Sequence, residues 1–147
     1  MTKTGSPRLV LGLALFMIVG SSGLAMNRPA DQSNTPLRAA KGEVLVTNRL
    51  DIDFSKYLVT FIELGADRCI PCKQMQPIMK EIAAEFAEDV LVVFYDVWKD
   101  PAPGRKFGIQ LIPTQVFVDQ KGNEIARHVG LFPKEEILEL LKKHGVH

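Results

Sequence analysis

Two stretches of the chain are almost continuously apolar, and an amphipathic stretch lies between them. Residues 56–65 (KYLVTFIELG) and 89–97 (DVLVVFYDV) are rich in branched and aromatic residues, which is typical of strands buried on both faces. Residues 71–88 predict a helix, in which Pro77 should produce a kink. The apolar positions of this helix recur at intervals of three and four residues: Met75, Ile78, Met79, Ile82, Ala83 and Phe86.

The second half of the chain predicts shorter elements. Residues 100–109 (DPAPGRKFGI) indicate a turn and a short helix, and residues 114–130 indicate a β-hairpin whose turn is Lys-Gly-Asn at 121–123. Residues 133–145 (PKEEILELLKKHG) predict a helix, because proline and two glutamates come first and the basic residues come last, as the helix dipole favours. A further strand is expected within residues 42–47 (GEVLVT).

The order of these elements predicts the fold class. A strand, a helix and a second strand come first, and this unit implies two parallel strands joined by a helical crossover. The hairpin then adds an antiparallel pair. We therefore predict an α/β fold of three layers, in which a central mixed sheet carries helices on both faces.

The N-terminus has the pattern of a secretory signal peptide over residues 1–25. Two basic residues are followed by a short apolar run at 9–19 and by small residues that suit a cleavage site. The alternative is an uncleaved membrane anchor, although the run is shorter than the roughly 20 apolar residues of a membrane span. Residues 26–41 are polar and contain two prolines, so we interpret them as a linker, and residues 42–147 as one domain.

Composition narrows the function classes. Hydrophobic residues make up 46% of the 147 residues, which is enough for the core of one domain. The net charge is +1, so nothing in the composition indicates a nucleic-acid partner, and we expect none. An exported location would also allow a disulfide to persist.

The chain has only two cysteines, Cys69 and Cys72, and they are close together in the sequence. A disulfide between them would close a very small loop, which stabilises a fold much less than a long loop does. A structural metal site usually needs four ligands. The chain has no second cysteine pair, and the remaining candidates are His128, His144 and His147, so we expect no metal. A redox centre is therefore the favoured interpretation, and an inert disulfide is the main alternative.

The cysteines lie where a predicted strand ends and a predicted helix begins. The first amides of a helix lack internal partners and the dipole is positive there, so a thiolate at Cys69 is stabilised and should be the nucleophile. Cys72 lies one turn further along and should be the more buried, resolving thiol that displaces a partner from Cys69. Pro71 fits the first helical turn because it has no amide hydrogen to leave unsatisfied.

Two other features complete the candidate site. Glu63 lies within the first buried strand, where apolar neighbours should raise its pKa and allow it to accept a proton from Cys72. The alternatives are that it faces solvent or is ion-paired.

Pro113 begins a strand, and the peptide bond before it could be trans or cis. A trans bond would be ordinary for a proline at the start of a strand. A cis bond would expose the backbone of Ile112 for pairing with an extended peptide.

Together these residues resemble the thioredoxin superfamily. CIPCK at 69–73 is similar to its Cys-x-Pro-Cys-Lys active site, KFGIQLIPT at 106–114 to the loop before its cis-proline, and HVG at 128–130 to its closing glycine segment. The resemblance covers residues 56–145. It implies a thioredoxin-like fold, a cis bond before Pro113 facing the cysteines, and Glu63 in the position of the buried acid.

The chain also departs from the superfamily pattern at three single positions and in the loop at 96–104 (DVWKDPAPG), which is slightly longer than usual. Arg68 stands where tryptophan is common, Gly65 stands where an aromatic residue is common, and an apolar residue near Val92 replaces the lysine expected beside the buried acid. These differences concern the substrate surface and the redox potential rather than the thiol chemistry. Arg68 should favour the thiolate of its neighbour and change which partners dock.

The resemblance also implies a function. The chain is most similar to exported, membrane-fed reductases that pass electrons to oxidised cysteines of secreted proteins, including apocytochromes c. We therefore expect protein thiols and disulfides as substrates and a membrane electron donor. We also expect a monomer with no cofactor beyond the Cys69–Cys72 disulfide. A disulfide oxidase or isomerase is the first alternative, and a non-enzymatic binder of extended polypeptides is the second.

Overall fold

The computed structural model describes Leu37 and residues 39–147. The predicted signal peptide (1–25) and most of the predicted linker (26–41) lie outside the described residues, and both stay predictions. Leu37, from the linker region, forms an isolated parallel bridge with Ile52 and packs against the core. None of the helices in the described part of the chain combines the length and the apolar character that a membrane crossing requires.

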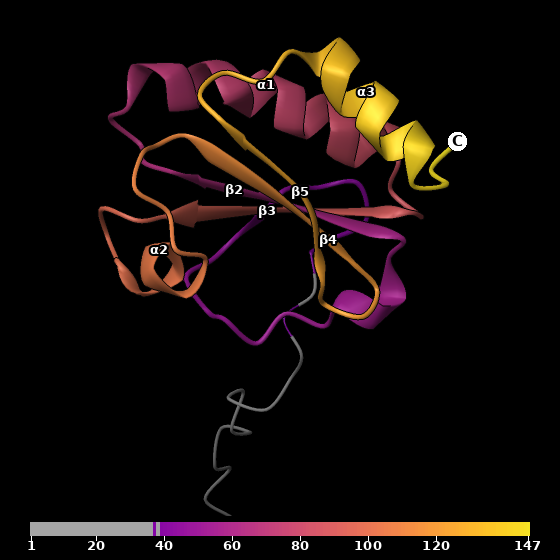
Figure 1. Cartoon of the computed structure of the whole chain (residues 1–147), viewed down its shortest axis with the longest axis horizontal. Coiled ribbons are helices and arrows are strands. Elements are labelled where there is room, and N and C mark those ends of the chain that lie inside the picture. The colour runs from indigo at the N-terminus through magenta and orange to yellow at the C-terminus, as the bar shows by residue number, and fades with distance from the viewer. Residues whose placement is uncertain (1–36, 38) are drawn as a thin grey trace, which may run out of the picture. The chain divides into compact units, whose positions relative to one another are not determined.

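A five-stranded mixed sheet forms the centre of the domain (Figure 1). Its strands stand in the order β1-β3-β2-β4-β5; β1 and β2 run parallel to β3, whereas β4 is antiparallel to both β2 and β5. The predicted mixed sheet and hairpin are therefore confirmed. The elements are β1 (Leu45–Val46), η2 (Phe54–Lys56), β2 (Val59–Gly65), α1 (Ile70–Glu85), β3 (Val90–Asp96), α2 (Ala102–Lys106), β4 (Thr114–Asp119), β5 (Glu124–Val129) and α3 (Lys134–Lys143).

Helices cover both faces of this sheet, as predicted. Figure 1 shows α1 and α3 on one face and the short α2 on the other. Between the sheet and the α1–α3 layer lies a core of aromatic and aliphatic side chains, in which Phe61 of β2 stacks on Phe117 of β4 at a centroid distance of 4.8 Å. A second core on the opposite face includes Ile62, Leu64 and Tyr95. Successive residues of β2 thus enter different cores, because strand side chains alternate between faces.

The first long strand begins later than its apolar pattern predicts. β2 starts at Val59 rather than at residue 56, and residues 54–56 form the short helix η2 instead. Asp53 explains the difference, because its carboxylate accepts hydrogen bonds from the backbone amide of Ser55 at 3.2 Å and from the Ser55 hydroxyl at 2.7 Å. Such local bonds to a side chain compete with strand pairing.

Helix α1 runs from Ile70 to Glu85 and continues through Pro77. It ends three residues before the predicted limit, where the amides of Asp89 and Val90 both bond to the carbonyl of Phe86 and close a turn into β3. The end of β2, the start of α1 and the start of β4 meet at the same edge of the sheet. This edge holds the two cysteines and Pro113, and Glu63 lies two residues before the end of β2.

Candidate active site

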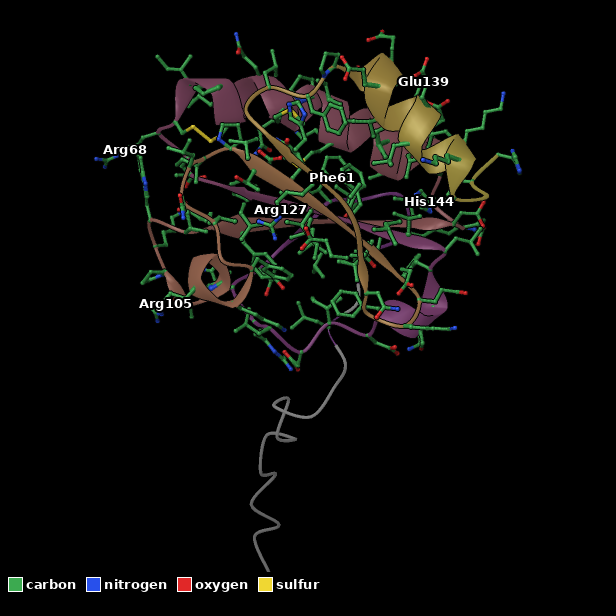
Figure 2. All side chains as sticks on the ribbon, in the orientation of Figure 1. Phe61, Arg68, Arg105, Arg127, Glu139 and His144 are labelled. Carbon is green, nitrogen blue, oxygen red and sulfur yellow. A yellow bond between two sulfur atoms is a disulfide. The ribbon has the colours of Figure 1, made fainter. Side chains whose placement is uncertain are left out.

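A disulfide joins Cys69 and Cys72 at the point where the chain passes from β2 into α1 (Figure 2). Cys69 is the N-cap of α1, and its sulfur accepts a hydrogen bond from the amide of Cys72 at 3.3 Å. Cys69 is 8% exposed and Cys72 only 1%. The predicted placement of the pair at a helix tip is confirmed, as is the deeper position of Cys72. The neighbouring Arg68 and Pro71 are exposed.

The peptide bond between Ile112 and Pro113 is cis, as the resemblance implied. The side chain of Ile112 packs against the small cluster formed by Ala66 and the two cysteines. Two hydrogen bonds hold the loop: Gly130 donates its amide to the carbonyl of Pro113 at 2.9 Å, and the hydroxyl of Thr114 donates to the carbonyl of Leu111 at 2.7 Å. Among the described residues, no hydrogen bond to the backbone amide or carbonyl of Ile112 is present. Its backbone is therefore available to a bound peptide.

Glu63 is completely buried on the face of β2 that α1 covers. The side-chain amide of Gln115, its partner across the β2–β4 pairing, donates a hydrogen bond to Glu63 Oε2 at 2.9 Å. Glu63 forms no salt bridge with any described residue. The solvent-facing and ion-paired alternatives for Glu63 are therefore wrong. Burial raises the pKa of Glu63 to about 8, and the hydrogen bond from Gln115 offsets only part of this rise.

Phe94, not Val92, is the residue of β3 that pairs with Glu63. The expectation of an apolar neighbour in place of a lysine is confirmed, but its position is corrected by two residues. Because Phe94 brings no positive charge to the carboxylate, it adds to the desolvation that raises the pKa of Glu63.

Gly65 leaves room for both the Phe94 ring and the disulfide. A Cβ atom on Gly65 would lie 3.1 Å from Cys72 Sγ and 3.1 Å from Phe94 Cε2, which is closer than side chains normally pack. Glu63 and Gly65 lie on the same face of β2, since they are two residues apart in a strand. The buried acid, the aromatic ring and the buried cysteine are therefore neighbours in one layer under the start of α1.

Comparison with known proteins settles the family. The family model described as Thioredoxin matches residues 46–143. The chain is similar to thioredoxin of Haemophilus influenzae, with 33% identity over 107 residues that cover 69% of this chain and 97% of the relative. It is also similar to thioredoxin of Staphylococcus aureus, with 32% identity over 97 residues that cover 64% of this chain and 92% of the relative. The chain belongs to the thioredoxin family.

A solved thioredoxin shares the fold. A mutant thioredoxin from Halobacterium salinarum superposes with a TM-score of 0.64 at 24% identity, covering 73% of this chain and 95% of that one.

As a thioredoxin-family member with its cysteine pair in place, the protein is a thiol–disulfide oxidoreductase. Thioredoxins need no cofactor, because the disulfide itself carries the electrons. Within the described residues, no three histidine, cysteine or acidic side chains are grouped to hold a metal.

One residue of this thioredoxin-type site was missed from the sequence. Gln115 is completely buried, and its side-chain nitrogen bridges Glu63 Oε2 and the carbonyl of Gly130, at 2.9 and 3.0 Å. It thereby joins the buried acid to the loop that also supports Pro113. A signal was present, because Gln115 is a polar residue in the apolar run TQVFVD, two positions before the core residue Phe117.

Proposed function

We propose that this protein is an exported reductant of disulfides in secreted or periplasmic proteins. Cys69 is the nucleophile, Cys72 the resolving thiol and Glu63 the proton acceptor. The observation that carries the proposal is the unequal placement of the two sulfurs. Cys69 caps α1 at the edge of the sheet, whereas Cys72 lies against Gly65 in the layer that holds the buried acid.

The first step uses Cys69 of the reduced protein. Its thiolate attacks one sulfur of the client disulfide, so that a Cys69–client bond forms and the client S–S bond breaks. The other client sulfur leaves as a thiolate and takes up a proton. The helix N-terminus favours the attacking thiolate, because unpaired amides and the positive end of the dipole lie there. Ile112 and Pro113 hold the client backbone beside this sulfur, and the exposed Arg68 and Pro71 contact its flanks.

The second step uses the buried pair. The carboxylate of Glu63 takes the proton from the thiol of Cys72, and the resulting thiolate attacks the sulfur of Cys69. The Cys69–Cys72 bond forms, the bond to the client breaks, and the client leaves as a dithiol that has gained two electrons. Because the pKa of Glu63 is about 8 in the oxidised protein, the acid holds this proton at neutral pH. It can return the proton to Cys72 when an electron donor reopens the disulfide.

Three features of the chain support the exported, reducing role. Residues 1–25 have the signal-peptide pattern, which supports export by either release or anchoring. Pro71 precedes the second cysteine, as in the membrane-fed reductases that the chain resembles. Between Cys72 and Pro113 the chain forms only α1, β3 and α2, so it lacks the inserted helical domain usual in disulfide oxidases. An electron donor in the membrane would complete the cycle.

Disulfide reduction by three variants tests the enzymatic role. With dithiothreitol as the electron source, the wild-type protein should reduce insulin, and Cys69→Ser should abolish this activity. Cys72→Ser should accumulate a mixed disulfide on Cys69 that is visible by mass spectrometry. Equal activity of wild type and Cys69→Ser would instead favour a non-enzymatic binder of polypeptides.

The direction of electron flow needs a separate measurement. Equilibration of the cysteine pair with glutathione buffers should give a potential close to the roughly −270 mV of thioredoxin-type reductants. A value near about −120 mV would identify an oxidase instead. For export, the protein expressed from the full-length sequence should be found outside the cytosol after cell fractionation, with or without residues 1–25. Recovery of the intact chain from the cytosol alone would contradict this part of the proposal.

A further inference from the structure

A groove of about 700 Å³ opens beside the disulfide, on the side of the molecule formed by α2 and the segment before Pro113. We call it the α2 groove. Ile112 lines it and also packs against the small cluster that contains both cysteines, so the groove adjoins the site of thiol exchange. The residues of the groove used below are Val97, Trp98, Arg105, Ile109, Leu111 and Ile112.

The α2 groove exposes large apolar side chains. Trp98 is 62% exposed and Leu111 is 66% exposed, although both are large enough to favour burial. Val97 and Ile109 also line the groove, and both are partly buried against the second core. Exposed apolar groups gathered in a groove next to a reactive centre indicate a binding surface rather than ordinary surface.

The lining of the α2 groove carries positive charge only. Arg105 is the only charged residue among those that line it. Neither Arg105 nor Arg68, the residue before Cys69, forms a salt bridge within the described part of the chain. Figure 2 shows both arginines on the edge of the domain at which the disulfide lies.

The acids near this edge have partners of their own. Asp67 and Asp96 both pair with Lys99, and Asp100 accepts a hydrogen bond from the amide of Ala102 at 2.8 Å. The two arginines therefore present guanidinium groups that no carboxylate of the described chain satisfies. A guanidinium group binds a carboxylate well because its planar donors match the two carboxylate oxygens.

We propose that the α2 groove binds the client polypeptide next to its reactive cysteine and selects segments that pair a large apolar residue with an acidic one. The apolar residue packs between Trp98 and Leu111, and the acidic side chain pairs with Arg105. The inference rests on the proposed function, since it takes the occupant to be the client whose disulfide Cys69 attacks. The free backbone of Ile112 positions the client chain so that it enters the groove from the thiol site.

Two matched substrates test the charge selection. Both are synthetic disulfide-linked peptides with leucine near the reactive cysteine, and they differ only in a neighbouring residue, which is glutamate in one and lysine in the other. The full-length wild-type protein should have a kcat/KM about fivefold higher for the glutamate peptide, as one close ion pair would give. The preference should weaken as salt is added.

Three variants assign this preference to Arg105. Arg105→Gln should remove it and Arg105→Glu should reverse it, while both variants still reduce each peptide. Lys121→Glu makes the same charge change in the β4–β5 turn, at the far end of β4 from the cysteines, and should keep the wild-type preference. If wild type and both Arg105 variants treat the two peptides alike, the inference is overturned and the proposed function stands. If neither peptide is reduced by the wild type, the proposed function itself fails.

Trp98 provides a direct readout of the groove, because it is the only tryptophan of the chain. In Cys72→Ser joined covalently to the glutamate peptide, the emission of Trp98 should shift to shorter wavelength and acrylamide should quench it less than in the same variant without peptide. Unchanged emission and quenching in this adduct would show that the client does not enter the groove.

Discussion

Replacing Glu63 by glutamine should change how the stability of the oxidised protein depends on pH. The substitution keeps the shape of the side chain and an oxygen that can accept the hydrogen bond from Gln115. It removes the capacity to ionise and places an uncharged amide nitrogen where one carboxyl oxygen stood. Because Glu63 is completely buried and its partner on β3 is the apolar Phe94, the ionised form is poorly solvated in the fold.

The titration of Glu63 sets the size of this effect. In the unfolded chain its pKa is near the ordinary value of 4.5, whereas burial raises it to about 8 in the fold. Between these two values only the folded state holds the proton, so the free energy of unfolding falls by roughly 1.4 kcal/mol per pH unit. The contribution is fully present below about pH 4.5 and is lost as the pH rises through about 8, a total on the order of 5 kcal/mol.

Urea unfolding of wild type and Glu63→Gln, with the disulfide intact, measures this difference. Between about pH 5 and about pH 8, the wild type should lose on the order of 4 kcal/mol more than the variant does. Above that range the two curves should run parallel. Parallel curves over the whole range would show that Glu63 ionises in the fold as it does in water. This result would refute its proposed role as the group that holds the proton of Cys72 in the oxidised protein.

Three further substitutions probe the surroundings of the acid. Gln115→Leu should raise the pKa of Glu63 further and lower the free energy of unfolding by about 1–3 kcal/mol, because Glu63 and the carbonyl of Gly130 lose their buried donor. A pKa of Glu63 at or below the wild-type value, measured by carbon-13 NMR, would contradict this. Gly65→Ala should cost about 1–3 kcal/mol by chemical denaturation, because its Cβ would crowd Cys72 and Phe94; wild-type stability would refute the close packing. Phe94→Lys should lower the pKa of Glu63, and an unshifted NMR titration would show that the lysine does not reach the acid.

The sequence predicted those parts of the site that depend on local pattern. The apolar composition of residues 56–65 predicted a buried strand that includes Glu63, and the spacing of apolar residues after Cys72 identified α1 and hence the helix tip at Cys69. Both predictions use only residues that are close together in the sequence, within a single helix or a single strand. The resemblance then supplied the cis bond before Pro113, which no local pattern determines.

The parts that were missed or misplaced depend on contacts between distant segments. Gln115 meets Glu63 across 52 residues of sequence, and this contact is fixed by the register between β2 and β4. The neighbour of Glu63 on β3 was placed near Val92 rather than at Phe94, because a continuous apolar run does not specify the register of a strand buried on both faces. The α2 groove likewise joins Trp98, Arg105 and Leu111 only through the fold.

The reactivity of the two thiols in the reduced protein tests the central claim most directly. Alkylation by iodoacetamide at mildly acidic pH, followed by mass spectrometry of each cysteine, compares the native protein with the same protein unfolded in urea. In the native protein Cys69 should react much faster than in the unfolded chain, and Cys72 much more slowly than Cys69. If both cysteines of the native protein react slowly and at the same rate as in the unfolded chain, α1 does not activate Cys69 and the account is wrong.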